Sequence, residues 1–249
     1  MTELDFIIDL HLNSERQGPG SEADTIKALE FTDLLEKENL NIADIGCGSG
    51  GQTITLAKYL NGSITAVDLF PAFLNELEAK AKSLGIDNRI KTLACPMEEL
   101  PFEENAFDLI FSEGAIYNSG FENGIKQWRK FLKPGGFLAV SEITWITNER
   151  PLAIEEFWQN EYPEISQAHH KIAQLEANGY SIRGYFKLPP ESWIEHYYNP
   201  MVDRFNTFLE RNKHHELAKK VVEDNKAEIE LYLKYQDYYS YGFYIASKN

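Results

Sequence analysis

A glycine-rich loop between an apolar strand and a helix constrains this chain more than any other feature of its sequence. Residues 40–45 are mostly apolar and are typical of a buried strand, and a helical pattern covers residues 52–60. The loop between them is Gly46-Cys47-Gly48-Ser49-Gly50-Gly51. Glycines that follow a strand let the backbone approach a ligand closely. The segment therefore predicts a strand–loop–helix unit that binds a ligand at its turn.

Strand and helix patterns alternate as far as residue 145. Four further strands follow the first, over residues 63–67, 89–94, 107–111 and 137–143. Pro71 opens a helix that ends near Gly85. Strands that alternate with helices through short connections build a mostly parallel sheet with helices on both faces. The expected fold class is therefore α/β and Rossmann-like.

The residues before the first strand predict two helices and a break. Residues 1–12 fit a short amphipathic helix. Gln17-Gly18-Pro19-Gly20 interrupts the chain, and Ser21 is a suitable N-cap for a helix that continues to about Leu35.

Beyond residue 145 the pattern changes to helices with two more strands. Helices are predicted over residues 155–162, 165–178 and 202–235, and strands over residues 180–188 and 241–247. Two proline-containing pairs, 189–190 and 199–200, bracket the aromatic segment 193–198. This segment is expected either to close a pocket or to pack the C-terminal helices.

Charge and cysteine content exclude several classes of protein. The formal net charge is -15, and no basic patch is found, so a nucleic acid partner is not expected. Cys47 and Cys95 are the only cysteines and have no metal-ligand spacing, which disfavours a zinc site or a disulfide framework. The acidic N-terminus does not fit a secretion signal, and no apolar run is long enough for a membrane span. A cytoplasmic protein without metal or membrane partner is expected.

Two aspartates at strand ends narrow the choice of ligand. Gly46, Gly48 and Gly51 satisfy the dinucleotide pattern G-x-G-x-x-G, which is a weak signal by itself. Asp44 stands two residues before Gly46, where it would repel a pyrophosphate and attract an ammonium group. Asp68 closes the next strand, where a carboxylate can accept hydrogen bonds from ribose hydroxyls. The pair favours S-adenosylmethionine (SAM) over NAD.

The ordered motifs of residues 40–145 resemble those of class I SAM-dependent methyltransferases, especially the small-molecule branch that includes the ubiquinone/menaquinone-biosynthesis type. Residues 44–50 resemble the first motif of the family, and Asp68 resembles its ribose-binding acid. Glu99-Leu100-Pro101-Phe102 with residues 106–110 resembles the approach to the fourth strand, and residues 132–137 resemble the turn before the fifth.

The resemblance implies a seven-stranded, mostly parallel sheet whose last strand is antiparallel. It divides the chain into three parts. Residues 1–144 contain the SAM-binding core and an N-terminal cover at Gln17-Gly18-Pro19-Gly20. Residues 145–237 form a helical cap on the substrate side that includes strand six, and residues 238–249 form the last strand. The implied cofactor is SAM, with S-adenosylhomocysteine (SAH) as its product.

The adenine site departs from the family pattern, because Pro96 stands where an aspartate is expected. Met97 could pack on the adenine ring, and Glu98 could replace the missing acceptor. The complete set of expected cofactor-binding residues is Asp44, Gly46, Cys47, Gly48, Gly50, Asp68, Leu69, Met97, Glu98 and Ser112.

The acceptor is expected beside the loop that follows the fourth strand. This loop carries Glu113 and Tyr117, which we expect to be catalytic, Glu113 as a base or as a group that orients the acceptor. A packed tyrosine and a carboxylate bonded to loop amides are the structural alternatives. Tyr117, Trp145, His196 and Tyr197 are the expected substrate-binding residues.

The expected function is transfer of a methyl group from SAM to a small molecule. The alternatives are a non-catalytic SAM-binding protein, for which Pro96 is the main support, and an NAD(P)-dependent oxidoreductase built on the glycines. A protein-modifying methyltransferase also fits, since an acidic face could recruit a basic partner. A homodimer is compatible with the sequence, which does not specify the number of subunits.

Overall fold

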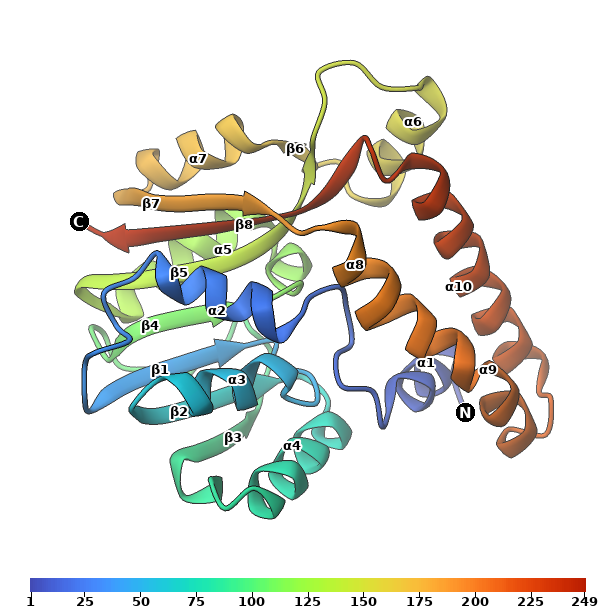
Figure 1. Cartoon of the computed structure of the whole chain (residues 1–249), viewed down its shortest axis with the longest axis horizontal. Coiled ribbons are helices and arrows are strands. Elements are labelled where there is room, and N and C mark those ends of the chain that lie inside the picture. Colours follow the sequence, from blue (N-terminus) through green and yellow to red (C-terminus); the bar gives the residue numbers. More distant parts are fainter.

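A mixed β-sheet forms the centre of the computed structural model, which describes residues 1–249 (Figure 1). The strands follow the order β3-β2-β1-β4-β5-β8-β7. β1 to β5 pair in parallel, and β8 is antiparallel to both β5 and β7. The Rossmann-like prediction and the antiparallel last strand are confirmed, and one two-residue strand, β6, is added beside β5. The bounds of the strands are β1 Leu40–Ile45, β2 Gly62–Asp68, β3 Ile90–Ala94, β4 Phe107–Ser112, β5 Leu132–Trp145, β6 Ser166–Gln167, β7 Tyr180–Lys187 and β8 Tyr239–Lys248.

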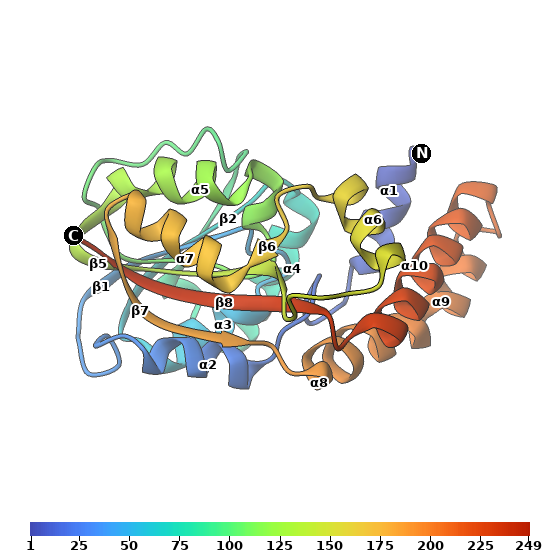
Figure 2. The same cartoon turned by 90° about the horizontal axis from the view of Figure 1, so that it is seen from above.

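Helices cover the sheet on both sides, with α2 and α3 opposite α5 and α7 (Figure 2). Successive side chains of a strand point to opposite faces, so β1 supplies Ile42 to one hydrophobic core and Ala43 and Ile45 to the other. This double burial explains why β1 has apolar residues on both faces rather than a strict alternation of apolar and polar residues. The bounds of these helices are α2 Glu22–Glu30, α3 Gly51–Tyr59, α4 Pro71–Ser83, α5 Phe121–Trp128 and α7 Ala168–Ala177.

A helical cap lies beyond the carboxyl ends of the parallel strands (Figure 1). Its first helix, α1, packs against α9 and α10 through Phe6 and Leu10, which are buried among Met201, Phe208 and Val221. None of the helices in the structure combines the length and the apolarity that a bilayer span requires. The predicted cap over residues 145–237 supplies α6 Leu152–Glu161, α8 Pro190–Trp193, α9 Asn199–Arg211 and α10 Glu216–Tyr235 to this layer, and α1 Glu3–His11 joins it from the N-terminus.

Several helix boundaries differ from the sequence prediction: α6 begins at Leu152 rather than Glu155, and α9 begins at Asn199 rather than Val202. α2 ends at Glu30 rather than near Leu35, because the Thr32 hydroxyl bonds to the Leu29 carbonyl and tightens the last turn. The predicted helix over residues 165–178 begins at Ala168, since residues 166–167 pair with β5. The predicted helix over residues 202–235 is two helices, separated by a turn in which Lys213 and His214 adopt left-handed φ angles of 51°.

The Asn199-Pro200 pair, predicted to bracket the aromatic segment 193–198, does not break the chain there. The chain stays helical from α8 to α9 through the π turn Ile194–Tyr198, in which the Asn199 N–H donates to the Ile194 carbonyl. A π turn widens the helix locally, and Pro200 lies in the first turn of α9, where its missing N–H costs little. Continuity of this helix brings the aromatic residues of the segment to the end of the sheet.

Candidate cofactor and acceptor site

A cavity of about 410 Å³ opens at the carboxyl ends of β1, β2 and β4. This is the position at which open α/β sheets bind ligands, and the volume falls in the ordinary range for a small-molecule site. Five short segments form its wall: residues 16–19 of the N-terminal cover, the glycine loop at 46–48, the end of β2 at 67–70, the segment 95–98, and the loop after β4 at 113–118.

Two glycines let the loop pass the cavity closely, because a side chain at either position would meet a neighbouring residue. Gly46 has a φ of +74°, and a Cβ at this position would lie 2.3 Å from Cβ of Ala115. Gly48 has a φ of +53° and also lines the cavity. Gly50 has a φ of +84° and does not line the cavity. A Cβ at this position would lie 2.2 Å from Leu77 of α4. Gly46 and Gly48 thus shape the wall, and Gly50 allows α3 and α4 to pack closely.

Asp68 is held rigidly at the end of β2. Its Oδ2 accepts a hydrogen bond from the Gly48 N–H at 2.8 Å, and its Oδ1 accepts one from the Phe70 N–H at 2.9 Å. Burial raises the pKa of Asp68, while these two amides act in the opposite direction. An ionised carboxylate has about four acceptor sites, so two remain for hydroxyl groups of a ligand in the cavity.

Asp44 lies behind the cavity wall rather than in it. Its Oδ2 accepts from the Thr53 hydroxyl at 2.5 Å and its Oδ1 from the Gln52 amide at 3.4 Å, and Gln52 itself lines the cavity. Complete burial raises the pKa of Asp44 to about 7. The carboxylate can therefore act on a ligand through Gln52, and its charge depends on pH near neutrality.

Apolar side chains form another part of the cavity wall. Phe70, Phe73 and Met97 form this part of the wall, and the Trp128 Nε1–H donates to the Met97 carbonyl at 3.2 Å. Pro96 lines the cavity but has neither a carboxylate nor an N–H, whereas Glu98 beside it is exposed and lines the cavity. The wall is suited to a flat apolar ring with a polar edge near Glu98.

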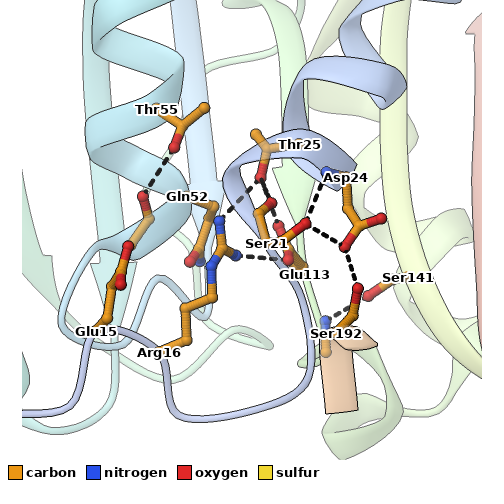
Figure 3. Close-up of polar contacts among 12 residues, drawn as sticks. Glu15, Arg16, Ser21, Asp24, Thr25, Gln52, Thr55, Glu113, Ser141 and Ser192 are labelled. Atoms are coloured by element: carbon orange, nitrogen blue, oxygen red, sulfur yellow. Dashed lines mark hydrogen bonds and ion pairs between the residues drawn. The ribbon is translucent and has the colours of Figure 1, made fainter. Parts of the chain in front are cut away.

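A buried ion pair fastens the N-terminal cover over the cavity (Figure 3). Arg16 Nη1 lies 2.6 Å from Oε1 of Glu113, and the two side chains are 6% and 3% exposed. The Thr25 hydroxyl accepts from Arg16 Nη2 at 3.1 Å and donates to Glu113 Oε2 at 3.1 Å. Both oxygens of Glu113 are therefore engaged within the protein. Burial raises the pKa of Glu113, and the Arg16 guanidinium opposes this rise.

The same network continues into the cap. Asp24 of α2 accepts hydrogen bonds from the hydroxyls of Ser21 and Ser192, both at 2.6 Å (Figure 3). Ser192 belongs to α8, and its carbonyl accepts from the Gly20 N–H at 3.2 Å. The cover is also tied to the glycine loop, because Gln17 Oε1 accepts from the Ser49 N–H at 2.7 Å. Cover, core and cap thus meet above the first cavity.

A second cavity of about 360 Å³ adjoins the first. The two cavities share the wall formed by Gln17, Gly18, Pro19, Gly114 and Tyr117. The rest of the second cavity is made by α6, the α8–α9 helix, α10 and the ends of β5 and β8. A molecule in one cavity can therefore lie next to a molecule in the other.

The expected acceptor residues are divided between the cavities and the rest of the protein. Tyr117 lines both cavities, and Tyr197 lines the second. Trp145 is buried in the core of the cap, where its ring lies 6.4 Å from that of Tyr239, and it lines neither cavity. His196 is exposed and lines neither cavity, because the helical turn directs it away from its neighbour Tyr197.

The remaining expected cofactor residues are placed as follows. Cys47 and Leu69 line the first cavity, and Ser112 is fully buried without lining it. Sequence reasoning missed Arg16, Gln52 and Phe73 in the first cavity and Glu228 in the second. No local motif marks these residues. The one feature of the sequence that could have indicated such a contact is Arg16, a basic residue four positions before Gly20.

The charges around the first cavity fit SAM better than a dinucleotide. Asp68, Glu98 and Glu113 line it, and the single basic residue of the wall, Arg16, is paired with Glu113. A pyrophosphate would find no free cation there, whereas an ammonium or sulfonium group would be attracted. Asp68, the apolar wall and the buried Asp44 together are compatible with a nucleoside that carries an amino-acid chain.

Comparison with known proteins finds methyltransferases similar in sequence to part of this chain. Residues 42–136 match the family model described as a methyltransferase domain. The Caenorhabditis elegans sterol 4-C-methyltransferase strm-1 is 32% identical over 110 residues, which is 43% of this chain and 32% of that protein. The Kluyveromyces lactis sterol 24-C-methyltransferase is 28% identical over 138 residues, 55% of this chain and 34% of that protein. The chain thus matches about a third of the length of these curated relatives.

The whole chain also matches a solved structure in fold. The Geobacter sulfurreducens SAM-dependent methyltransferase in complex with SAH superposes with a TM-score of 0.82 at 18% identity, covering 100% of this chain and 99% of that one. The agreement extends over the cap as well as the sheet, so the complete architecture is that of a known methyltransferase structure.

Proposed function

We propose that this chain is a SAM-dependent methyltransferase that modifies a small molecule. The observation that carries the proposal is the pair of adjoining cavities, one suited to the cofactor and one to an acceptor, with Tyr117 in their common wall. The match of residues 42–136 to the methyltransferase domain supports it. The proposal has two further parts, both based on the sequence motifs. The chain is divided into residues 1–144, 145–237 and 238–249, and it is placed near the ubiquinone/menaquinone-biosynthesis branch.

The residues that would hold SAM are those of the first cavity. Asp68 would accept the ribose hydroxyls, Phe70, Phe73 and Met97 would enclose the adenine, and Asp44 with Gln52 would attract the ammonium group. When bound, SAM supplies a methyl group on a positively charged sulfur, which a nucleophile can accept by in-line displacement. The protein contributes mainly by position and by exclusion of water.

Tyr117 and Glu113 would serve the acceptor in different ways. Tyr117 is 40% exposed and lines both cavities. A tyrosine hydroxyl is protonated at neutral pH, and desolvation raises the pKa of Tyr117 further, so the hydroxyl can donate a hydrogen bond that orients an acceptor. Glu113 has both oxygens occupied, so we assign it to hold Arg16 and the cover rather than to remove a proton.

Calorimetric titration with SAH, with NAD as the control, tests the proposal. Binding of SAH without binding of NAD is expected, followed by transfer of label from methyl-labelled SAM to a panel of small molecules. Tight binding of NAD alone would revive the oxidoreductase alternative. SAH binding without transfer to any acceptor, including basic protein substrates, would favour the non-catalytic alternative.

Affinity for SAH is expected to rise by about tenfold from pH 6 to pH 8, because Asp44 ionises with a pKa of about 7 and the ionised form attracts the ligand ammonium. Binding should then release protons below pH 7. In the ligand-free protein the same raised pKa lowers stability as pH rises from about 4 to about 7, since Asp44 ionises earlier when the chain is unfolded. The measurement is calorimetry in two buffers of different ionisation enthalpy.

Asp44→Asn is the matched control for this pH dependence. It should bind SAH more weakly and with no rise between pH 6 and pH 8, since the amide does not titrate. An unchanged pH profile in Asp44→Asn would assign the dependence to another group.

A further inference from the structure

The second cavity has an unusual chemical composition. Nine of the residues that line it are aromatic, among them Trp158, Trp193, Tyr197 and Tyr241, and none is lysine, arginine or histidine. Two carboxylates, Glu161 and Glu228, are its only charged residues. An anionic acceptor would therefore lose its hydration without gaining a cation, whereas a cation would meet aromatic faces and carboxylates.

Buried charge near the cavity does not change this balance. Lys171 packs 5.6 Å from the centre of the Tyr162 ring, but it does not line the cavity and its Nζ lies 3.1 Å from Oε1 of Glu142. Both side chains of this pair are at most 1% exposed. The cation is therefore neutralised within the protein and is not available to a ligand.

Glu228 projects from α10 into the cavity. Its Oε1 accepts a hydrogen bond from the Tyr198 hydroxyl at 3.0 Å, which fixes the carboxylate, and no protein group bonds its second oxygen. Glu228 is accessible to solvent and lines the second cavity. Surrounding protein desolvates the group and raises its pKa. A cationic ligand would relieve this cost by pairing with the free oxygen.

The aromatic rings around Glu228 are held in place by one another. Trp193 stacks on Tyr241 with ring centres 5.2 Å apart and on Tyr232 at 4.4 Å, and the Trp193 Nε1–H donates to the Ser240 hydroxyl at 3.0 Å. These contacts preorganise a cavity wall that needs little adjustment on binding. A flat or apolar body can fill this space while a charged group reaches Glu228.

We propose that the acceptor is a small organic amine, cationic at neutral pH and carrying an aromatic or apolar body, and that Glu228 selects its charge. For transfer to the amine nitrogen, the ammonium would first give one proton to the free oxygen of Glu228. The nitrogen lone pair would then form the N–C bond as the S–C bond of the bound cofactor breaks, with SAH as the leaving group. The proposal rests on the proposed function, since it assigns the second cavity to the acceptor. Because Tyr117, Gly114 and residues 17–19 separate the two cavities, the bound amine lies against the wall that the cofactor cavity shares.

The test is calorimetric titration of the SAH-saturated protein with arylalkylamines and with acids of matched shape. Phenethylamine and tyramine are the amine probes, and 3-phenylpropionate and 3-(4-hydroxyphenyl)propionate are the anionic probes. At pH 7.5 both amines are expected to bind at least roughly tenfold more tightly than the acids, on the usual strength of a hydrogen bond to a charged group. Equal or tighter binding of the acids, or no binding of the amines, would overturn the proposal.

Two variants on the same helix locate the effect. Glu228→Gln keeps the shape and the hydrogen bond from Tyr198 but removes the charge, so amine affinity should fall by roughly 10- to 100-fold. Glu223→Gln is the matched control, because Glu223 is exposed on α10 and lines neither cavity, and it should leave amine affinity unchanged. An equal loss in both variants would assign the effect to the overall negative charge and not to Glu228.

The titrations separate failure of this inference from failure of the proposed function. If the chain binds SAH but prefers the acids, the methyltransferase proposal stands and the amine assignment is wrong. If the chain does not bind SAH, the proposed function fails, and amine binding to the SAH-free protein still reports on the second cavity. The Glu228→Gln variant should retain SAH affinity, since Glu228 does not line the first cavity.

Discussion

Replacement of Asp68 by alanine is expected to weaken SAH binding by at least about 100-fold. The carboxylate would accept two ribose hydroxyls, and each hydrogen bond to a charged group contributes about 1.5–3 kcal/mol. The loss should exceed that of any other single change in the first cavity, because Asp68 is the one acidic wall residue that is both partly buried and fixed by two backbone amides. Calorimetric titration with SAH measures the effect.

A structural loss must be distinguished from a binding loss in this variant. Asp68 also bonds to the amides of Gly48 and Phe70, so alanine could disturb the loop. Asp68→Asn keeps one acceptor oxygen and should fold normally, with an intermediate affinity for SAH. If Asp68→Ala melts at the wild-type temperature and binds SAH with unchanged affinity, the ribose assignment is wrong.

Replacement of Arg16 by methionine is expected to destabilise the protein by about 3–5 kcal/mol, because it leaves the Glu113 carboxylate buried without its cation. For a chain of this size each kcal/mol lowers the melting temperature by about 2–4 °C. The change should also weaken SAH binding, since Arg16 fastens the cover whose residues 16–19 line the first cavity. Thermal unfolding with and without SAH measures both effects.

Two further variants check the origin of this loss. Arg16→Met combined with Glu113→Gln should recover much of the stability, because no buried charge remains. Lys133→Met removes a half-exposed ion pair with Asp108 and should cost no more than about 1 kcal/mol. Similar losses in Arg16→Met and Lys133→Met would contradict the role assigned to the buried pair.

The strand pattern of the core could be predicted because it follows from local chemistry. A strand such as β1 that is buried on both faces must be mostly apolar, and the ends of β1, β2 and β4 are marked by a glycine or a polar residue. The end of α2 and the turn between α9 and α10 could not be predicted, because neither contains the glycine or proline that usually marks a break. Side-chain bonds and two left-handed residues replace those signals.

Some residues of the cofactor site could be predicted from the sequence, whereas the composition of the acceptor site could not. Gly46, Gly48 and Asp68 lie within 23 residues of one another, so the strand–loop–helix pattern alone brings them together. Glu228 and Tyr117 are separated by more than 100 residues and meet only because the cap folds over the sheet edge. His196 and Tyr197 differ by one position, and helical geometry alone decides that Tyr197 lines the cavity.

Local patterns were enough to predict the sheet, the glycine loop and the acids at the ends of β1 and β2, because these depend on residues close in the chain and on the periodicity of burial. The pairing of Glu113 with Arg16, the position of Asp44 behind Gln52 and the carboxylates without cations in the second cavity became visible in the folded chain alone. Charge pairing and desolvation depend on what surrounds a group in space, and those neighbours come from distant parts of the chain.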